Sequence, residues 1–109
     1  MRPALLFFLN KLFKMNLGNT IKELRVKKGV KQNEFAQICS ITQSYLSNIE
    51  SDRKEPTISI LQEISKNLGI PLPIIFFLAM DESDVSPEKK IHFQTIAPLL
   101  KNTLIQTFT

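Results

Sequence analysis

Uncharged side chains that form hydrogen bonds are concentrated between residues 42 and 48. They are Thr42, Gln43, Ser44, Ser47 and Asn48. Gln and Asn amides can bond an adenine through two atoms of its major-groove edge, serine bonds more permissively, and a threonine methyl can contact thymine. These residue types therefore indicate a surface that reads base edges of DNA, with a lean toward A·T pairs.

The residues that catalysis or metal binding would need are sparse. The chain has one cysteine, Cys39, and one histidine, His92, so neither a disulfide framework nor a multi-ligand Cys/His site can form within one chain. The three glycines, Gly18, Gly29 and Gly69, lie far apart, and they form no phosphate-binding loop. We expect no enzyme activity, no metal and no cofactor, and we expect Cys39 to be a small buried hydrophobe.

The helices that would position these polar side chains follow from the spacing of apolar residues three or four positions apart. The predicted helices cover residues 19–28, 32–39 and 43–50. Gly29 can end the first helix in a left-handed conformation, and Thr42 can cap the third. Only residues 40–42 separate the second helix from the third, which is the tight turn of a helix-turn-helix.

Two further helices are predicted after a polar loop. Thr57 caps a helix that Gly69 stops, and Pro73 lies in the first turn of another that ends near Met80. This fifth helix is apolar almost all round, so another element must cover it. No alternation typical of strands occurs along the chain. The sequence therefore predicts an all-α fold, with a five-helix domain over residues 15–80.

Residues 81–109 are predicted to form an acidic linker and a C-terminal helix, with Ser86 as a hydroxyl cap and Pro87 at the first helical position. The apolar stripe of this helix consists of Phe93, Ile96, Ala97, Leu100, Leu104 and Phe108. Its spacing is close to a coiled-coil seam, which favours self-association. The alternative is that the stripe folds back on its own protomer and covers the fifth helix. Pro98 is expected to kink or split the helix near Ala97.

Residues 1–14 carry an apolar stripe at helical spacing. It consists of Leu5, Leu6, Leu9, Leu12 and Phe13. No small-residue cleavage site follows it, and no apolar run reaches the roughly 18 to 20 residues that span a bilayer. We therefore expect a cytoplasmic protein that does not bind membranes. Because Met15 directly precedes the first helical pattern, residues 1–14 are interpreted as an extension upstream of a domain that starts at Met15.

Several separate positions agree with one family pattern. They are Leu24-Arg25 before Gly29, Gln32 with Phe35-Ala36, Tyr45-Leu46-Ser47 with Ile49-Glu50, Pro56, and Leu68-Gly69-Ile70. By these positions the chain from about residue 17 to residue 80 resembles the Cro/repressor-type (XRE-family) helix-turn-helix domain of phage repressors, restriction-modification controller proteins and related bacterial regulators. Ser40 stands where that family usually has glycine in the turn, and Lys31 stands where it usually has a Thr or Ser cap.

The resemblance implies roles for side chains around the third helix. It places Gln32 at the start of the supporting helix, close to Gln43 and to a DNA phosphate. It also implies an ion pair between Arg25 and Glu50, which joins the first helix to the third. The third helix would then be the recognition helix in the major groove. In such a complex, phosphate contacts fix the register while base contacts supply the sequence preference.

Fourteen Lys and Arg against ten Asp and Glu give a net charge of +4, which suits a polyanionic partner. The cations around the predicted turn are Lys27, Lys28 and Lys31 before it, and Arg53 and Lys54 after it. We expect phosphate contacts from Lys28, Lys31, Arg53 and Lys54. For the three lysines the alternative is that they solvate a helix end. Tyr45 either packs in the core with a solvated hydroxyl, which we favour, or contacts a phosphate.

Together these features favour a sequence-specific regulator of transcription. It would bind double-stranded DNA as a homodimer on a two-fold operator and repress by occluding a promoter. The alternative is an antitoxin or adaptor whose tail, residues 86–109, binds a protein partner. Non-specific nucleic-acid binding is a third alternative, which an uncharged reading face suits poorly.

Overall fold

The computed structural model describes residues 16–109, so the extension predicted for residues 1–14 lies outside the described residues. The helices are α2 (Leu17–Lys27), α3 (Gln32–Ile38), α4 (Gln43–Glu50), α5 (Ile58–Leu68), α6 (Leu72–Ala79) and α7 (Lys90–Phe108). Two short 3-10 turns, Glu82–Asp84 and Pro87–Lys89, precede α7. Residues 16–109 contain no strand, so the all-α prediction is confirmed. None of their helices has the length and apolar character that a membrane crossing requires.

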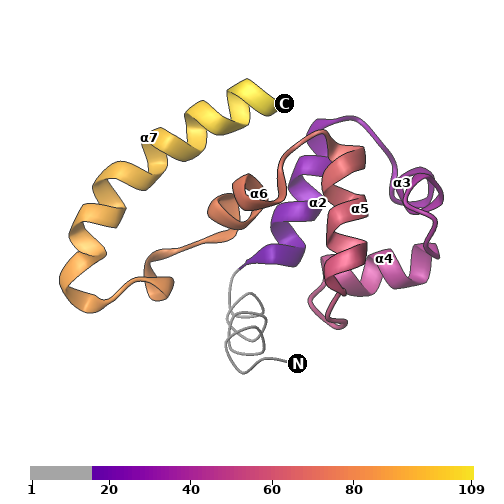
Figure 1. The fold of residues 1–109 in the computed structure, drawn as a ribbon, viewed down its shortest axis with the longest axis horizontal. Helices are drawn as coiled ribbons and strands as arrows, with labels where there is room; N and C mark the ends of the chain where they lie inside the picture. The colour runs from indigo at the N-terminus through magenta and orange to yellow at the C-terminus, as the bar shows by residue number, and fades with distance from the viewer. Residues whose placement is uncertain (1–15) are drawn as a thin grey trace.

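Figure 1 shows α2 to α6 gathered into one bundle, with α7 on the other side of α6 from α3 and α4. The helix ends lie close to where the capping residues predict them. The Thr42 hydroxyl accepts a hydrogen bond from the Tyr45 backbone N–H at 3.0 Å, and the Thr57 hydroxyl accepts one from Ile60 at 3.2 Å. Gly29 and Gly69 have φ angles of 78° and 73°, the left-handed conformation in which glycine commonly ends a helix.

The two positions that depart from the family pattern adopt the conformations the turn requires. Ser40 has a φ of 59°, so a serine occupies the left-handed region that glycine enters more readily. Lys31 is the extended residue before α3, and its side chain forms no capping hydrogen bond. The turn therefore forms without either of the usual residues.

The core of the bundle lies between α2, α3, α4, α5 and α6. Its most completely buried large side chains are Phe35, Ile21, Leu46, Ile49, Leu61, Ile64, Ile70 and Ile75. Cys39 is also buried, as predicted. Burial raises the pKa of its thiol to about 11, so the thiolate is scarce at neutral pH and the residue acts as a small hydrophobe.

Helix α2 meets the end of α4 backbone to backbone at Gly18. A Cβ at this position would lie 2.4 Å from the Ile49 carbonyl oxygen and 2.6 Å from Oδ1 of Asp52. Gly18 is itself buried. The absence of a side chain here therefore allows the first turn of α2 to approach the last turn of α4.

The start of the C-terminal helix differs from the prediction. The Ser86 side chain forms no capping hydrogen bond, and Pro87 opens a separate 3-10 turn. Helix α7 begins only at Lys90 and continues through Pro98 to Phe108. Of the predicted kink or split near Ala97, the split does not occur. One proline removes a single bond from the backbone ladder, and the remaining bonds of this long helix hold it together.

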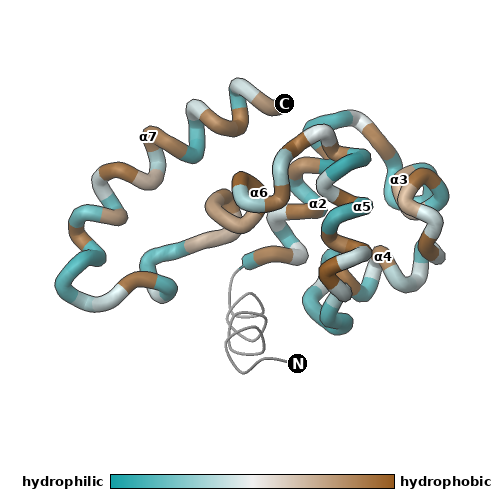
Figure 2. Tube along the Cα trace, in the orientation of Figure 1, coloured by the Kyte–Doolittle hydropathy of each residue, from teal (hydrophilic) through white to brown (hydrophobic). Residues whose placement is uncertain are grey.

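Helix α7 folds back on its own chain only in part. Within α7 the buried residue is Ala97, and Phe108 packs half-buried against the core of the bundle. The Lys101 ammonium donates to the Met80 carbonyl oxygen at the end of α6. The predicted stripe members Ile96 and Leu100 stay 52% and 48% exposed. Figure 2 shows apolar residues distributed along this outlying helix.

A polar turn connects α6 with α7. The Asp81 carboxylate accepts hydrogen bonds from the Ser83 hydroxyl and backbone N–H, and these bonds lower the pKa of Asp81. The Gln94 amide donates to the Glu82 carboxylate. The predicted acidic linker is therefore an ordered turn that holds the first half of α7.

We predict that Gly18→Ala destabilises the fold by roughly 1 to 3 kcal/mol, because the new methyl group would be forced against backbone atoms of α4. Glycine-to-alanine changes inside a helix usually stabilise a protein, so a loss of stability here would itself indicate the close approach of α2 to α4. Urea unfolding measures the effect. Gln62→Ala at an exposed position of α5 is the control and should change stability little. Equal stability of the two variants would contradict the close approach.

Candidate nucleic-acid interface

An ion pair joins α2 to α4 inside the bundle. Arg25 Nε donates to Glu50 Oε2 at 2.8 Å, and Arg25 Nη2 donates to Glu50 Oε1 at 3.1 Å. The two residues are only 7% and 6% exposed. A two-atom contact of this kind is among the stronger charged hydrogen bonds. The pairing of Arg25 with Glu50 that the family resemblance implies is thus present.

Further hydrogen bonds satisfy the remaining polar atoms of the pair. Arg25 Nη1 donates to the Val30 carbonyl oxygen at 2.8 Å, and Gln32 Nε2 donates to Glu50 Oε1 at 2.9 Å. Among residues 16–109 no buried side-chain nitrogen or oxygen lacks a partner. These hydrogen bonds matter because a buried charge without partners is strongly destabilising.

The same network reaches the solvent-exposed start of α4. Gln43 Nε2 donates to Gln32 Oε1 at 3.4 Å, a long hydrogen bond. Gln32 therefore lies between Gln43 at the surface and Glu50 in the core, and the predicted proximity of Gln32 to Gln43 is confirmed. A chain of four side chains, Arg25, Glu50, Gln32 and Gln43, links the core to the candidate reading surface.

Helix α4 has two faces of different chemistry. Leu46, Ile49 and Glu50 are buried. The predicted reading residues Thr42, Gln43, Ser44 and Ser47 are exposed, and Asn48 is half-buried. The structure therefore places four of the five predicted reading residues at exposed positions of α4 or its N-cap, and leaves Asn48 partly exposed on the same helix.

Tyr45 is half-buried and packs against the hydrophobic core. This placement agrees with the favoured interpretation of an aromatic residue in core packing. A phosphate contact from its hydroxyl stays a prediction.

The predicted phosphate-binding cations fall into two groups. The Lys28 ammonium donates to the Leu68 carbonyl oxygen at 3.3 Å, which places it at the C-terminal end of α5 and agrees with the helix-end alternative. Lys31, Arg53 and Lys54 are exposed. Within the described residues the ion pair is Arg25–Glu50. Because none of these three cations belongs to that pair, they are available for an outside partner.

The loop after α4 is folded against that helix. The backbone N–H groups of Arg53 and Lys54 both donate to the Asn48 carbonyl oxygen, at 2.8 and 3.1 Å. The backbone of these two cationic residues is thereby fixed next to the end of α4. Lys31 lies at the start of α3, on the other side of the turn.

Sequence reasoning missed the contribution of Asp52. Its Oδ1 accepts a hydrogen bond from the Gly18 N–H at 3.2 Å, across 34 positions of the chain. Its φ of 61° is left-handed. The local signal was an aspartate directly after a helix end, a residue type that tolerates this conformation, but nothing local indicated its distant partner.

Residues 16–109 contain no group of three or more His, Cys, Asp or Glu side chains that could hold a metal ion. His92 is exposed on α7, and Cys39 is buried.

We predict that Glu50→Ala lowers the free energy of unfolding by roughly 3 to 5 kcal/mol, because it leaves the Arg25 guanidinium buried without its carboxylate. Thermal and urea unfolding measure the loss. Glu34→Ala, which removes an exposed carboxylate from α3, is the control. An unchanged melting temperature for Glu50→Ala would show that the pair does not hold α2 and α4 together.

Comparison with known proteins agrees with this geometry. The helix-turn-helix family profile matches residues 21–75. The immunity repressor protein of Bacillus phage phi105 is 34% identical over 61 residues, which cover 56% of this chain and 42% of the repressor. The transcriptional regulator PuuR of Escherichia coli K12 is 36% identical over 59 residues, 54% of this chain and 32% of PuuR. The chain thus spans less than half the length of these two relatives.

A shorter relative and solved structures extend the comparison. The control protein C.MunI from Mycoplasma is 34% identical over 64 residues, 58% of this chain and 86% of that protein. One crystal structure of the clp gene regulator ClgR from Corynebacterium glutamicum has a TM-score of 0.55 and 28% identity, covering 58% of this chain and 82% of that one. A second, with a TM-score of 0.59 and 23% identity, covers 87% and 93% and shows likeness of fold alone. The chain belongs to the helix-turn-helix family of Cro/repressor type, whose members are DNA-binding transcriptional regulators and not enzymes.

Proposed function

We propose that this regulator reads a specific double-stranded DNA sequence with α4 and represses transcription by occluding a promoter. The observation that carries the proposal is the two-faced α4. Its inner face is fixed by the buried Glu50, while the outer face carries uncharged hydrogen-bonding side chains. In the major groove, the five reading residues would contact base edges. They are Thr42, Gln43, Ser44, Ser47 and Asn48.

The proposed role of Gln32 is to set the position of Gln43. Its amide oxygen accepts from Gln43 while its amide nitrogen donates to Glu50. The Gln43 side chain is thereby biased toward one orientation before DNA arrives, which reduces the conformational entropy that binding costs. A direct contact of Gln32 with a phosphate stays part of the proposal.

The proposed phosphate contacts come from Lys31, Arg53 and Lys54, which stand exposed on both sides of the reading helix. Such contacts supply affinity and register but no sequence preference. We assign Lys28 to the end of α5, because its ammonium is already bonded to the Leu68 carbonyl oxygen.

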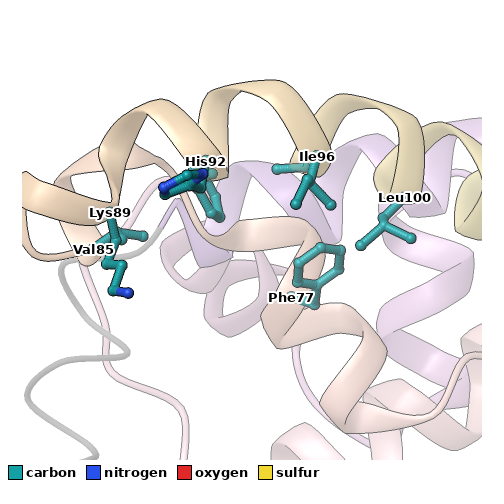
Figure 3. A pocket seen from close by; sticks show the side chains of 8 residues that line it. Phe77, Val85, Lys89, His92, Ile96 and Leu100 are labelled. Carbon is teal, nitrogen blue, oxygen red and sulfur yellow. The ribbon is translucent and has the colours of Figure 1, made fainter.

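We further propose that α7 joins two copies into a homodimer, which sets two recognition helices about 34 to 36 Å apart on a two-fold operator. Figure 3 shows Ile96 and Leu100 of α7 facing Phe77 of α6 across an open cavity of about 240 Å³. Ile91 and Leu99, on the same helix, are 74% and 72% exposed. Helix α7 therefore carries apolar side chains both at the cavity and on its exposed surface. Two copies related by a two-fold axis can cover each other's exposed apolar residues.

We predict that the wild type binds the DNA immediately upstream of its own gene at near-physiological salt with excess competitor. A Gln43→Ala/Asn48→Ala double variant should lose roughly 2 to 6 kcal/mol of binding, since each two-atom base contact contributes about 1 to 3 kcal/mol. Gln62→Ala removes an exposed amide from α5, outside both α4 and α7, and serves as the control. Binding that is equal in all three proteins would contradict base reading by α4.

We predict a dimer for the wild type at micromolar concentration in sedimentation experiments. Leu99→Asp should shift it to monomer and weaken operator binding, because a charge would be buried in the interface. Gln62→Asp, at an exposed polar position of α5 and outside the proposed interface, should leave the dimer intact. A monomeric wild type would contradict the dimer. A stoichiometric protein partner retained through residues 86–109 would instead favour the antitoxin or adaptor function.

A further inference from the structure

Asp52 connects the loop after α4 with the start of α2. Its Oδ1 accepts from the Gly18 N–H at 3.2 Å, and Gly18 is the second residue of α2. Asp52 adopts a φ of 61°, a conformation that non-glycine residues seldom adopt but that aspartate tolerates. The strained backbone and the distant hydrogen bond occur at the same residue.

This hydrogen bond replaces a local cap. Asn16 is the residue before α2, and its side chain forms no capping hydrogen bond. The first N–H groups of a helix need acceptors from outside the helix, and a carboxylate is favourable at this positive end. Asp52 supplies such an acceptor from the loop beyond α4. The loop and the start of α2 are therefore linked.

The loop has a second attachment, at the end of α4. The Arg53 and Lys54 backbone N–H groups share the Asn48 carbonyl oxygen, and the Ser51 hydroxyl donates to Ser47 at 2.9 Å. The loop is thus fixed on one side to α4 and, through Asp52, on the other side to α2. Arg53 and Lys54 lie directly after Asp52, the residue that attaches the loop to α2.

We propose that Asp52 is a positioning residue for DNA binding: by holding the loop to α2, it keeps Arg53 and Lys54 directed at the phosphates beside the recognition helix. This inference rests on the proposed function. The hydrogen bond also turns the Asp52 carboxylate toward the Gly18 N–H, so that its negative charge faces the start of α2 instead of the neighbouring cations.

The test is the salt dependence of operator binding, because the slope of log K against log salt counts phosphate contacts at about 0.9 each. Asp52→Gly removes the carboxylate and leaves a residue that accepts the left-handed conformation. We expect its slope to be shallower than that of the wild type by about 1.8, the value for two lost contacts. Removal of a negative charge alone would strengthen DNA binding, so the expected change opposes the simple charge effect.

Two variants separate positioning from capping of α2. Asn16→Asp/Asp52→Gly gives α2 a local carboxylate cap and restores the formal net charge. It should recover the melting temperature but keep the shallow slope, and it replaces Asp52→Gly if that variant fails to fold. Asp52→Asn keeps an oxygen acceptor and tolerates the left-handed conformation, so it should retain the wild-type slope.

Arg53→Ala/Lys54→Ala provides the reference. Adding Asp52→Gly to this pair should reduce the slope no further, because the two changes act on the same contacts. A wild-type slope in the Asp52→Gly or the Asn16→Asp/Asp52→Gly variant, or an additive effect in the triple variant, would overturn the positioning role. If the wild type binds no DNA sequence preferentially, the proposed function itself is overturned. This result differs from a wild type that binds its operator while the Asp52 variants keep the wild-type salt slope, which overturns only the role of Asp52.

Discussion

The buried pair of Arg25 and Glu50 is the constraint on which the rest of the DNA-binding unit depends. Two charges removed from water are tolerated only when hydrogen bonds satisfy nearly all their polar atoms. Here that requires both Glu50 oxygens, the Val30 carbonyl oxygen and the Gln32 amide in fixed places. Helix α2, the turn after Gly29 and helices α3 and α4 must therefore fit together at one point. The rotation of α4 about its own axis follows, and with it the direction of its polar face.

A helix as short as α4 is marginal by itself, so tertiary contacts must hold it. At its start, Thr42 caps the helix and Gln32 bonds to Gln43. At its end, the bare backbone of Gly18 lies against the Ile49 carbonyl oxygen. Both ends of the proposed reading helix are therefore held by α2 and α3. Rigid support of this kind is what a site needs to present side chains in one geometry.

Sequence reasoning succeeded where structure is decided locally or by a known pattern. Thr42, Thr57 and Gly69 marked helix ends because caps and left-handed stops act within one turn. It failed where partners are distant: Lys28 bonds to Leu68, and Asp52 bonds to Gly18. The apolar stripe of α7 was predicted, yet periodicity cannot say what covers a stripe, and Ile96 and Leu100 stay about half exposed. The sequence predicted which residue types lie on the exposed face of α4. It could not predict which DNA bases they contact, because the DNA is not encoded in this chain.

The bundle and the tail differ in how many of their apolar and charged side chains are buried with partners. The bundle buries its charges with full pairing, whereas α7 is held mainly by Ala97 and Phe108, by the Gln94 contact to Glu82 and by the Lys101 contact to Met80. Any partner that covers the exposed side of α7 will therefore stabilise the tail by mass action. Helix α6 connects the tail with the bundle, since the Ala79 carbonyl oxygen at its end accepts from the Asn16 N–H before α2. In the dimer that we propose, the packing of α7 on α6, of α6 on α2 and of α2 on α4 would join the interface to the reading helix.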